Sequence, residues 1–176
     1  MIEQDYFALF QLPRQYEIDL SALDAAWKRV SMQVHPDRFA TASPAEKRVA
    51  MQWSSRANEG YRILRDPLAR ARYLCELAGV DLQTETNTAM SPGFLIQQME
   101  WREQLDEIEA RADQAALLSL AATLSSALDD VQHAVGAHLD AAEYEKAAQR
   151  LREWMFIDKF HQQVQTLQGL ASPTFN

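Results

Sequence analysis

The stretch WKRVSMQVHPDRF, residues 27–39, interrupts a regular helical pattern with residues that cannot continue it. Up to this point, apolar side chains recur at intervals of three and four, as they do along one face of a helix: Leu20, Leu23, Trp27, Val30 and Val34. Pro36 has no amide hydrogen, and its ring disfavours a helical conformation at His35. The sequence therefore predicts a helix over residues 20–34 and a loop over residues 35–43.

A second helix is predicted directly after this loop. The segment Ser43-Pro44-Ala45-Glu46 places a capping residue, a proline and a glutamate in the order of a capping box. The apolar stripe that follows predicts a helix over residues 44–65: Val49, Trp53, Ala57, Gly60 and Leu64. Since the two stripes can pack together, we expect an antiparallel hairpin whose exposed tip carries the sequence His-Pro-Asp.

The remaining pattern is also helical. Five more helices are expected, over residues 4–12, 67–78, 92–110, 114–139 and 141–170. Their starts are marked by Asp66-Pro67, Ser91-Pro92 and a second capping box at Asp140 and Glu143. The polar segment VDLQTETNTAM, residues 80–90, lacks periodicity and suggests a linker. We therefore expect an all-α fold, with an N-terminal domain at 1–78, a linker at 79–91 and a three-helix bundle at 92–176.

Composition narrows the class of protein. The chain has 176 residues, 47% of them apolar, and a single cysteine, Cys75, which excludes an internal disulfide framework. Residues 1–79 carry 11 Lys or Arg against 10 Asp or Glu, whereas residues 80–176 carry 6 against 15. This acidic balance argues against a nucleic-acid partner. Without a signal peptide or a long apolar run, we expect no membrane partner and a reducing compartment.

The residues His35 and Asp37 could be a catalytic pair, metal ligands, a helix stop or a recognition element. Catalysis needs a nucleophile or electrophile close to the pair, and the loop offers only Arg38, Thr41 and Ser43. Metal binding needs further ligands, but the other histidines lack helical pair spacing: His133, His138 and His161. We expect no enzyme activity, metal or cofactor; an exposed aspartate can instead accept hydrogen bonds from a partner's arginine.

The acidic half opens with a helix that has two apolar faces, FLIQQMEWREQLDEIE, residues 94–109. At 100° per residue, one face forms a core stripe: Phe94, Trp101, Leu105 and Ile108. On the opposite side, a second apolar group lies beside three glutamates: Leu95, Ile96, Met99, Glu100, Glu103 and Glu107. An apolar patch with an acidic rim is typical of a partner-binding face. The alternative is that these apolar residues pack against the first domain.

Three segments together resemble a J-domain, the module by which co-chaperones stimulate the ATPase of DnaK-type chaperones: DYFALFQLP, WKRVSMQVHPDRF and ANEGYRILRDPLARARYL. The match covers residues 5–75. It implies that His35, Pro36 and Asp37 contact the nucleotide-binding domain of the chaperone. It also implies that Lys28 and Arg29 supply an electrostatic docking face. Gln33 and Asp24 fall where many J-domains carry cations, which favours a dedicated chaperone partner.

The whole chain is similar to the HscB family of co-chaperones in bacterial iron–sulfur cluster assembly, on the segments FLIQQMEWREQLDEIE and LREWMFIDKF. The resemblance implies an L-shaped, monomeric, cytoplasmic adaptor that presents the scaffold IscU to the DnaK-type ATPase HscA. It implies a scaffold-binding set: Leu95, Ile96, Met99, Glu100, Glu103, Glu107 and Phe156. The place of Phe156 rests on the resemblance alone. The alternative is a J-protein that delivers a different client.

Overall fold

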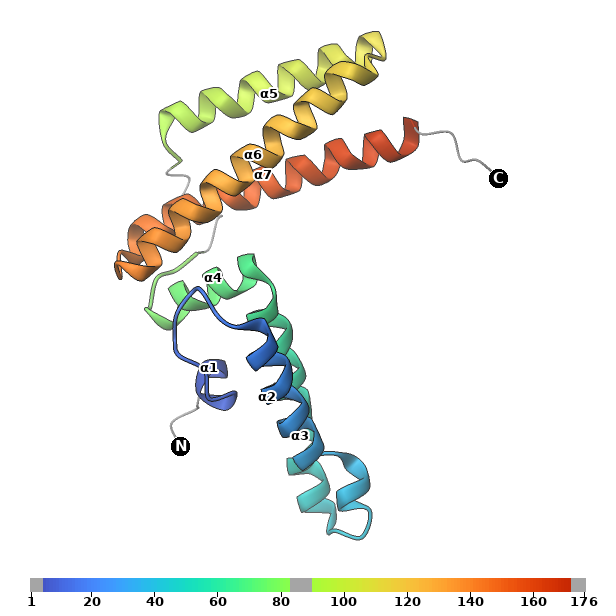
Figure 1. Ribbon diagram of the computed structural model, residues 1–176, viewed down its shortest axis with the longest axis vertical. Coiled ribbons are helices and arrows are strands. Elements are labelled where there is room, and N and C mark those ends of the chain that lie inside the picture. Colours follow the sequence, from blue (N-terminus) through green and yellow to red (C-terminus); the bar gives the residue numbers. More distant parts are fainter. Residues whose placement is uncertain (1–4, 83–89, 172–176) are drawn as a thin grey trace. The chain divides into compact units, whose positions relative to one another are not determined.

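The computed structural model describes residues 5–82 and 90–171, and all regular secondary structure in these residues is helical (Figure 1). Its elements are α1 (Tyr6–Leu9), α2 (Leu20–Gln33), the 3₁₀ turn η1 (Pro36–Phe39), α3 (Pro44–Arg65), α4 (Pro67–Leu77), α5 (Pro92–Arg111), α6 (Gln114–Asp140) and α7 (Tyr144–Ala171). The predicted all-α class is confirmed. The chain divides into two units, Met1–Ala78 and Gly79–Asn176, each described below by itself. Most of the expected linker lies outside the described residues, and the L-shaped arrangement stays a prediction.

In the first unit, α2 and α3 form the predicted antiparallel hairpin (Figure 1). The side chain of Leu23 on α2 and that of Leu64 on α3 are fully buried. Along one edge, the indole of Trp27 stacks on the Tyr61 ring and donates a hydrogen bond of 3.0 Å to the Asn58 side chain. The capping box at the start of α3 is present as predicted. These contacts hold the hairpin that displays the His-Pro-Asp loop.

The predicted core stripe of α3 is wrong at its N-terminal end. Ala57, Gly60 and Leu64 are buried, but Val49 and Trp53 are exposed and Ala50 is buried in their place. The cause is the shape of the unit: α1 and α4 pack against α3 near the base of the hairpin, and the tip is only two helices thick (Figure 1). Periodicity identifies a helix face, but it does not show where a third element stops covering that face.

Gly60 allows α1 to pack closely on α3. A Cβ atom at this position would lie 2.5 Å from Cδ1 of the Tyr6 ring, so the ring occupies the space that a side chain would fill. The Tyr6 amide also donates a hydrogen bond of 3.1 Å to the Tyr73 hydroxyl, and the two rings lie 4.9 Å apart. This contact joins α1, α3 and α4 at the base of the hairpin.

We predict that Gly60→Ala destabilises the protein by about 1–3 kcal/mol, the usual cost of overpacking a filled site. Gly169→Ala on α7 is the matched control, because no atom lies within 4 Å of its new Cβ. Alanine has the higher helix propensity, so the control should be neutral or stabilising by up to about 1 kcal/mol. Urea unfolding monitored by circular dichroism measures both. Equal effects of the two changes would contradict the close packing of α1 on α3.

The second unit contains α5, α6 and α7 (Figure 1). The long helices α6 and α7 pack antiparallel, and α5 packs on α6. The core is mostly aliphatic with two aromatic side chains from α7, and its members on α6 and α7 include Leu117, Leu120, Leu124, Val131, Val135, Leu151, Trp154, Ile157, Phe160 and Val164. From α5, Trp101 and Leu105 are buried. The predicted three-helix pattern is thus present, and it fixes which side of α5 faces inward.

The capping box predicted at Asp140 and Glu143 is wrong. Helix α6 continues through Asp140, Ala142 has a positive φ of 55°, and α7 begins only at Tyr144. Glu143 does not close a box; its carboxylate accepts hydrogen bonds of 2.7 Å from Lys146 and from the His138 ring. These two hydrogen bonds, from Lys146 first and then from His138, lower the pKa of Glu143. The glutamate therefore joins the end of α6 to the first turn of α7.

We predict that Glu143→Gln makes the protein less stable at neutral pH. A carboxyl whose pKa is lowered by folding stabilises the folded state above its unfolded pKa of about 4.3. That contribution is lost as the pH falls through the lower folded value. The stability difference between wild type and variant, measured by thermal unfolding, should therefore be present at pH 7 and disappear near pH 3. The exposed Glu145, changed to glutamine, is the control. A difference that stays constant with pH would contradict this role.

Candidate partner-binding surfaces

The His-Pro-Asp loop is a capped 3₁₀ turn at the tip of the hairpin. Pro36 occupies the first helical position, where its missing amide hydrogen costs no hydrogen bond. His35 is the N-cap: its Nδ1 accepts a hydrogen bond of 3.3 Å from the Asp37 amide. The His35 carbonyl accepts a second bond of 3.0 Å from the Arg38 amide. The three residues therefore form a local structure that does not depend on burial.

The side chains of this turn are open to solvent. Those of His35 and Asp37 are 58% and 91% exposed, and the Asp37 carboxylate lies 3.4 Å from His35 Nδ1. An ion pair at this distance requires Nδ1 to be protonated, whereas the cap requires Nδ1 to accept, so the two interactions are alternatives. In the capped state the Asp37 carboxylate has all its strong acceptor positions available to a partner. This geometry suits recognition.

Basic residues lie near the loop as predicted. Lys28 and Arg29 are exposed on α2, roughly 10 Å from His35 by the helical rise. Asp24, which departs from the pattern of many J-domains, accepts hydrogen bonds of 2.8 Å from the Tyr61 hydroxyl and 2.6 Å from Arg65. The carboxylate thus joins α2 to α3, which gives the departure a structural reason.

Sequence reasoning missed an apolar surface around the tip. Four large apolar side chains are exposed there or nearby on α2 and α3: Met32, Val49, Met51 and Trp53. A shallow hollow of about 280 Å³ lies between η1 and the start of α3, lined by Phe39, Ala45, Glu46, Val49 and Ala50. The signal was available in the sequence, but regular spacing placed two of these residues in the core.

Helix α5 presents the second surface. Leu95, Ile96 and Met99 are 45%, 58% and 62% exposed, so their own unit leaves them uncovered. Trp101 and Leu105 are buried on the opposite side, as the predicted division into two faces requires. The three predicted rim residues are also exposed: Glu100, Glu103 and Glu107. The apolar group and its acidic rim are therefore both available to a partner.

The start of α5 is fixed by a buried carboxylate. Ser91 caps the helix by accepting a hydrogen bond from the Phe94 amide, and its hydroxyl also hydrogen-bonds to Glu153 on α7. Burial raises the pKa of Glu153, and the charge and hydrogen bond of Arg150 oppose this rise. Leu95 and Ile96 are the fourth and fifth residues of α5, so they lie close to this hydrogen-bonded start of the helix.

The structure places Phe156, which periodicity could not. Its ring is 5.8 Å from Phe94 on α5, nearly perpendicular, and 5.9 Å from Phe160, nearly parallel. The Arg102 guanidinium lies over the ring at 5.6 Å from its centre. Phe156 therefore adjoins α5 at a groove of about 420 Å³ between α5 and α7.

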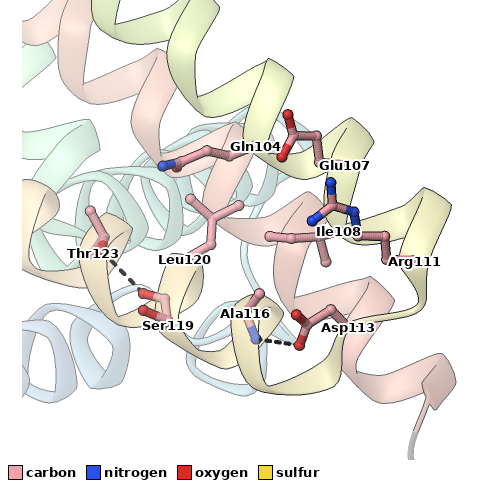
Figure 2. Close-up of a pocket in the computed structure, with 9 residues that line it drawn as sticks. All are labelled: Gln104, Glu107, Ile108, Arg111, Asp113, Ala116, Ser119, Leu120 and Thr123. Atoms are coloured by element: carbon pink, nitrogen blue, oxygen red, sulfur yellow. Dashed lines mark hydrogen bonds between the residues drawn. The ribbon is translucent and has the colours of Figure 1, made fainter.

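A second groove, of about 250 Å³, lies on the other side of α5, against α6 (Figure 2). Glu107, Gln104 and Arg111 of α5 line it opposite Ser119, Leu120 and Thr123 of α6. Arg102 lines the first groove and Glu107 lines the second. At 100° per residue, these two residues are about 140° apart around α5. The predicted scaffold-binding residues thus span the outer side of α5 from one groove to the other, over roughly 18 Å from Leu95 to Glu107.

Within the described parts of the chain, no group of three or more His, Cys, Asp or Glu side chains could hold a metal ion. No helix in the same parts is long and apolar enough to cross a membrane.

Comparisons with a protein-family model and with individual proteins lead to the same family. A family model described as "HSCB C-terminal oligomerisation domain" matches residues 90–165. The chain is 59% identical over 165 residues to "Co-chaperone protein HscB homolog" of Bordetella petrii, covering 93% of this chain and 96% of that protein. It is 54% identical over 171 residues to the same-named protein of Bordetella pertussis, with 97% and 99% covered.

The solved structures that this chain matches belong to the same family. HscB from Vibrio cholerae matches with a TM-score of 0.83 and 34% identity, over 96% of this chain and all of that one. Human HscB matches with a TM-score of 0.85 and 26% identity, over 94% and 83%. The chain belongs to the HscB co-chaperone family. HscB structures combine an N-terminal J-domain with a C-terminal helical domain, and the fold class predicted here is the same.

Membership of the HscB family identifies a co-chaperone, but it does not test the role of any single residue. The structure displays His35 and Asp37, and it displays the outer face of α5. That these residues bind partners stays a prediction, and so do the docking roles of Lys28 and Arg29.

We predict that Leu95→Ala and Met99→Ala change the free energy of unfolding by less than about 0.5 kcal/mol, because both side chains are exposed. Trp101→Ala on the same helix removes a buried ring and should cost about 3–5 kcal/mol. Chemical denaturation of the three variants measures this. A large loss from either outer variant would show that the outer face is structural.

Proposed function

We propose that this HscB-family chain is a non-enzymatic adaptor between an iron–sulfur cluster scaffold of the IscU type and a DnaK-type chaperone of the HscA type. The outer face of α5 binds the scaffold, and the His-Pro-Asp turn stimulates the ATPase of the chaperone. One observation carries the proposal: the chain displays two different exposed surfaces, each on its own compact unit.

The chaperone-binding role is supported by the geometry of the turn. A capped, exposed aspartate can accept charge-assisted hydrogen bonds without any cost of unpacking. The exposed Lys28 and Arg29 add positive charge on the adjoining helix, which would steer the unit toward an acidic surface. Binding stimulates hydrolysis if the turn has higher affinity for the hydrolysis-competent state of the chaperone, because it then shifts the population toward that state.

The scaffold-binding role is supported by the chemistry of α5. Three exposed apolar side chains supply a contact centre, and the glutamates beside them favour a basic partner surface.

The family description also suggests self-association through this domain. A symmetric contact of α5 with a second copy would bring glutamates of the same patch together, which like-charge repulsion disfavours. Sedimentation of the free protein should show a monomer.

Joining both surfaces in one chain raises the local concentration of the scaffold at the chaperone. The alternative is a J-protein that delivers another client through α5. In that case the chaperone ATPase would respond to the chain, but an IscU-type scaffold would not bind.

We predict that Asp37→Asn abolishes stimulation of the chaperone ATPase and leaves scaffold affinity unchanged, because the turn loses its charged acceptor but α5 is intact. Steady-state hydrolysis and calorimetry measure the two activities. The control is Asp19→Asn, an exposed capping aspartate at the other end of α2. Stimulation near the wild-type rate in Asp37→Asn would show that the turn is not the contact.

We predict the reverse for the triple change of Leu95, Met99 and Phe156 to alanine. Hot-spot truncations cost about 1–4 kcal/mol each in binding, so scaffold affinity should fall at least a hundredfold. Stimulation by the chain alone should stay at the wild-type rate. Unchanged scaffold affinity would rule out α5 as the binding surface.

A further inference from the structure

Arg102 is an unusual residue on α5. Between residues 92 and 110 it is the single Lys or Arg, among five Asp or Glu. Its charge therefore opposes that of a surface expected to attract a basic partner. Simple electrostatics would predict that such a residue weakens binding.

Its position suggests a different role. The Arg102 guanidinium lies over the ring of Phe156, which also meets the edge-on ring of Phe94 and the nearly parallel ring of Phe160. Phe160 is buried and Phe94 is half-buried, whereas Arg102 is exposed to solvent. A cation over an aromatic face is attracted by the ring quadrupole.

Arg102 also continues the apolar face of α5. At 100° per residue, Leu95 and Arg102 are about 20° apart, and Met99 lies one turn before Arg102. Residues at these spacings are neighbours on a helix surface. The Arg102 side chain thus leaves α5 beside the line of Leu95 and Met99, and its guanidinium reaches Phe156 on α7.

We propose that Arg102 is a positioning residue for partner binding: it holds the Phe156 ring beside Leu95 and Met99, so that residues from two helices form one preorganised surface. Fixing a contact residue in its bound conformation raises affinity, because less freedom is lost on binding. This inference rests on the proposed binding of the scaffold by α5.

The test is a double-mutant cycle in the full chain, with scaffold affinity measured by calorimetry for wild type, Arg102→Ala, Phe156→Ala and the double variant. If Arg102 acts through Phe156, Arg102→Ala weakens binding about two- to fivefold, the usual size of an exposed cation–π contact. The same change then has no effect once Phe156 is alanine. Arg102→Lys, which keeps the cation, should restore part of the affinity.

Arg111→Ala is the matched control. It removes the same charge from the same helix, but Arg111 lines the groove on the α6 side (Figure 2). For a basic partner this control should bind equally well or slightly more tightly. Arg102→Ala should bind less tightly, so only this one of the two variants weakens binding. Ring-proton shifts of Phe156 in the free protein should also change in Arg102→Ala and not in Arg111→Ala.

Several outcomes would overturn the inference. If Arg102→Ala tightens binding as Arg111→Ala does, Arg102 acts only through net charge. If Arg102→Ala weakens binding equally in the Phe156→Ala background, the guanidinium contacts the partner directly and does not position the ring. If wild type does not bind the scaffold, the proposed function fails and the positioning role falls with it. If wild type binds and Phe156→Ala weakens binding, but Arg102→Ala changes nothing, only the positioning role fails.

Discussion

Helix α5 carries apolar residues on two faces, and a helix packed on one side of a bundle can bury only one of them. Trp101 and Leu105 are buried against the rest of the second unit, which determines that Leu95, Ile96 and Met99 face outward. Burial of a large aromatic side chain stabilises by several kcal/mol, more than exposure of the smaller outer residues costs. The exposed apolar patch is therefore a direct result of core packing, and the acidic residues beside it set the partner that it suits.

The first unit meets a similar constraint by different means. The first backbone N–H groups of the 3₁₀ turn η1 need acceptors, and the His35 ring accepts a hydrogen bond from one of them, the Asp37 amide. Because the turn is stabilised locally, the tip of the hairpin does not have to be covered by α1 or α4. Asp37 can then remain almost fully exposed at the end of the two-helix hairpin. In both units, the residues proposed to bind partners are exposed because other residues carry the packing.

Much of this could be predicted from the sequence. Cap residues and prolines marked the starts of α3, α4 and α5, since these signals act within one helical turn. Two predictions were wrong and the place of Phe156 could not be predicted, because each depends on contacts made outside a single helix. Val49 and Trp53 are exposed because no third helix reaches the tip, Glu143 binds His138 and Lys146 and does not form a capping box, and the place of Phe156 depends on how α5 meets α7. Spacing along one helix contains none of this information.

The central claim is that one chain must carry both surfaces at once. It is tested by mixing two variants, one with Asp37→Asn and one with Leu95, Met99 and Phe156 changed to alanine. Chaperone ATP hydrolysis is then measured at a scaffold concentration below the dissociation constant of the scaffold–chaperone complex. If the chain acts as an adaptor, the mixture stimulates hydrolysis only as far as the chain does without scaffold, and it lacks the further increase that scaffold delivery gives with wild type. A mixture that restores the wild-type rate would show that the two surfaces act independently, and it would contradict the account.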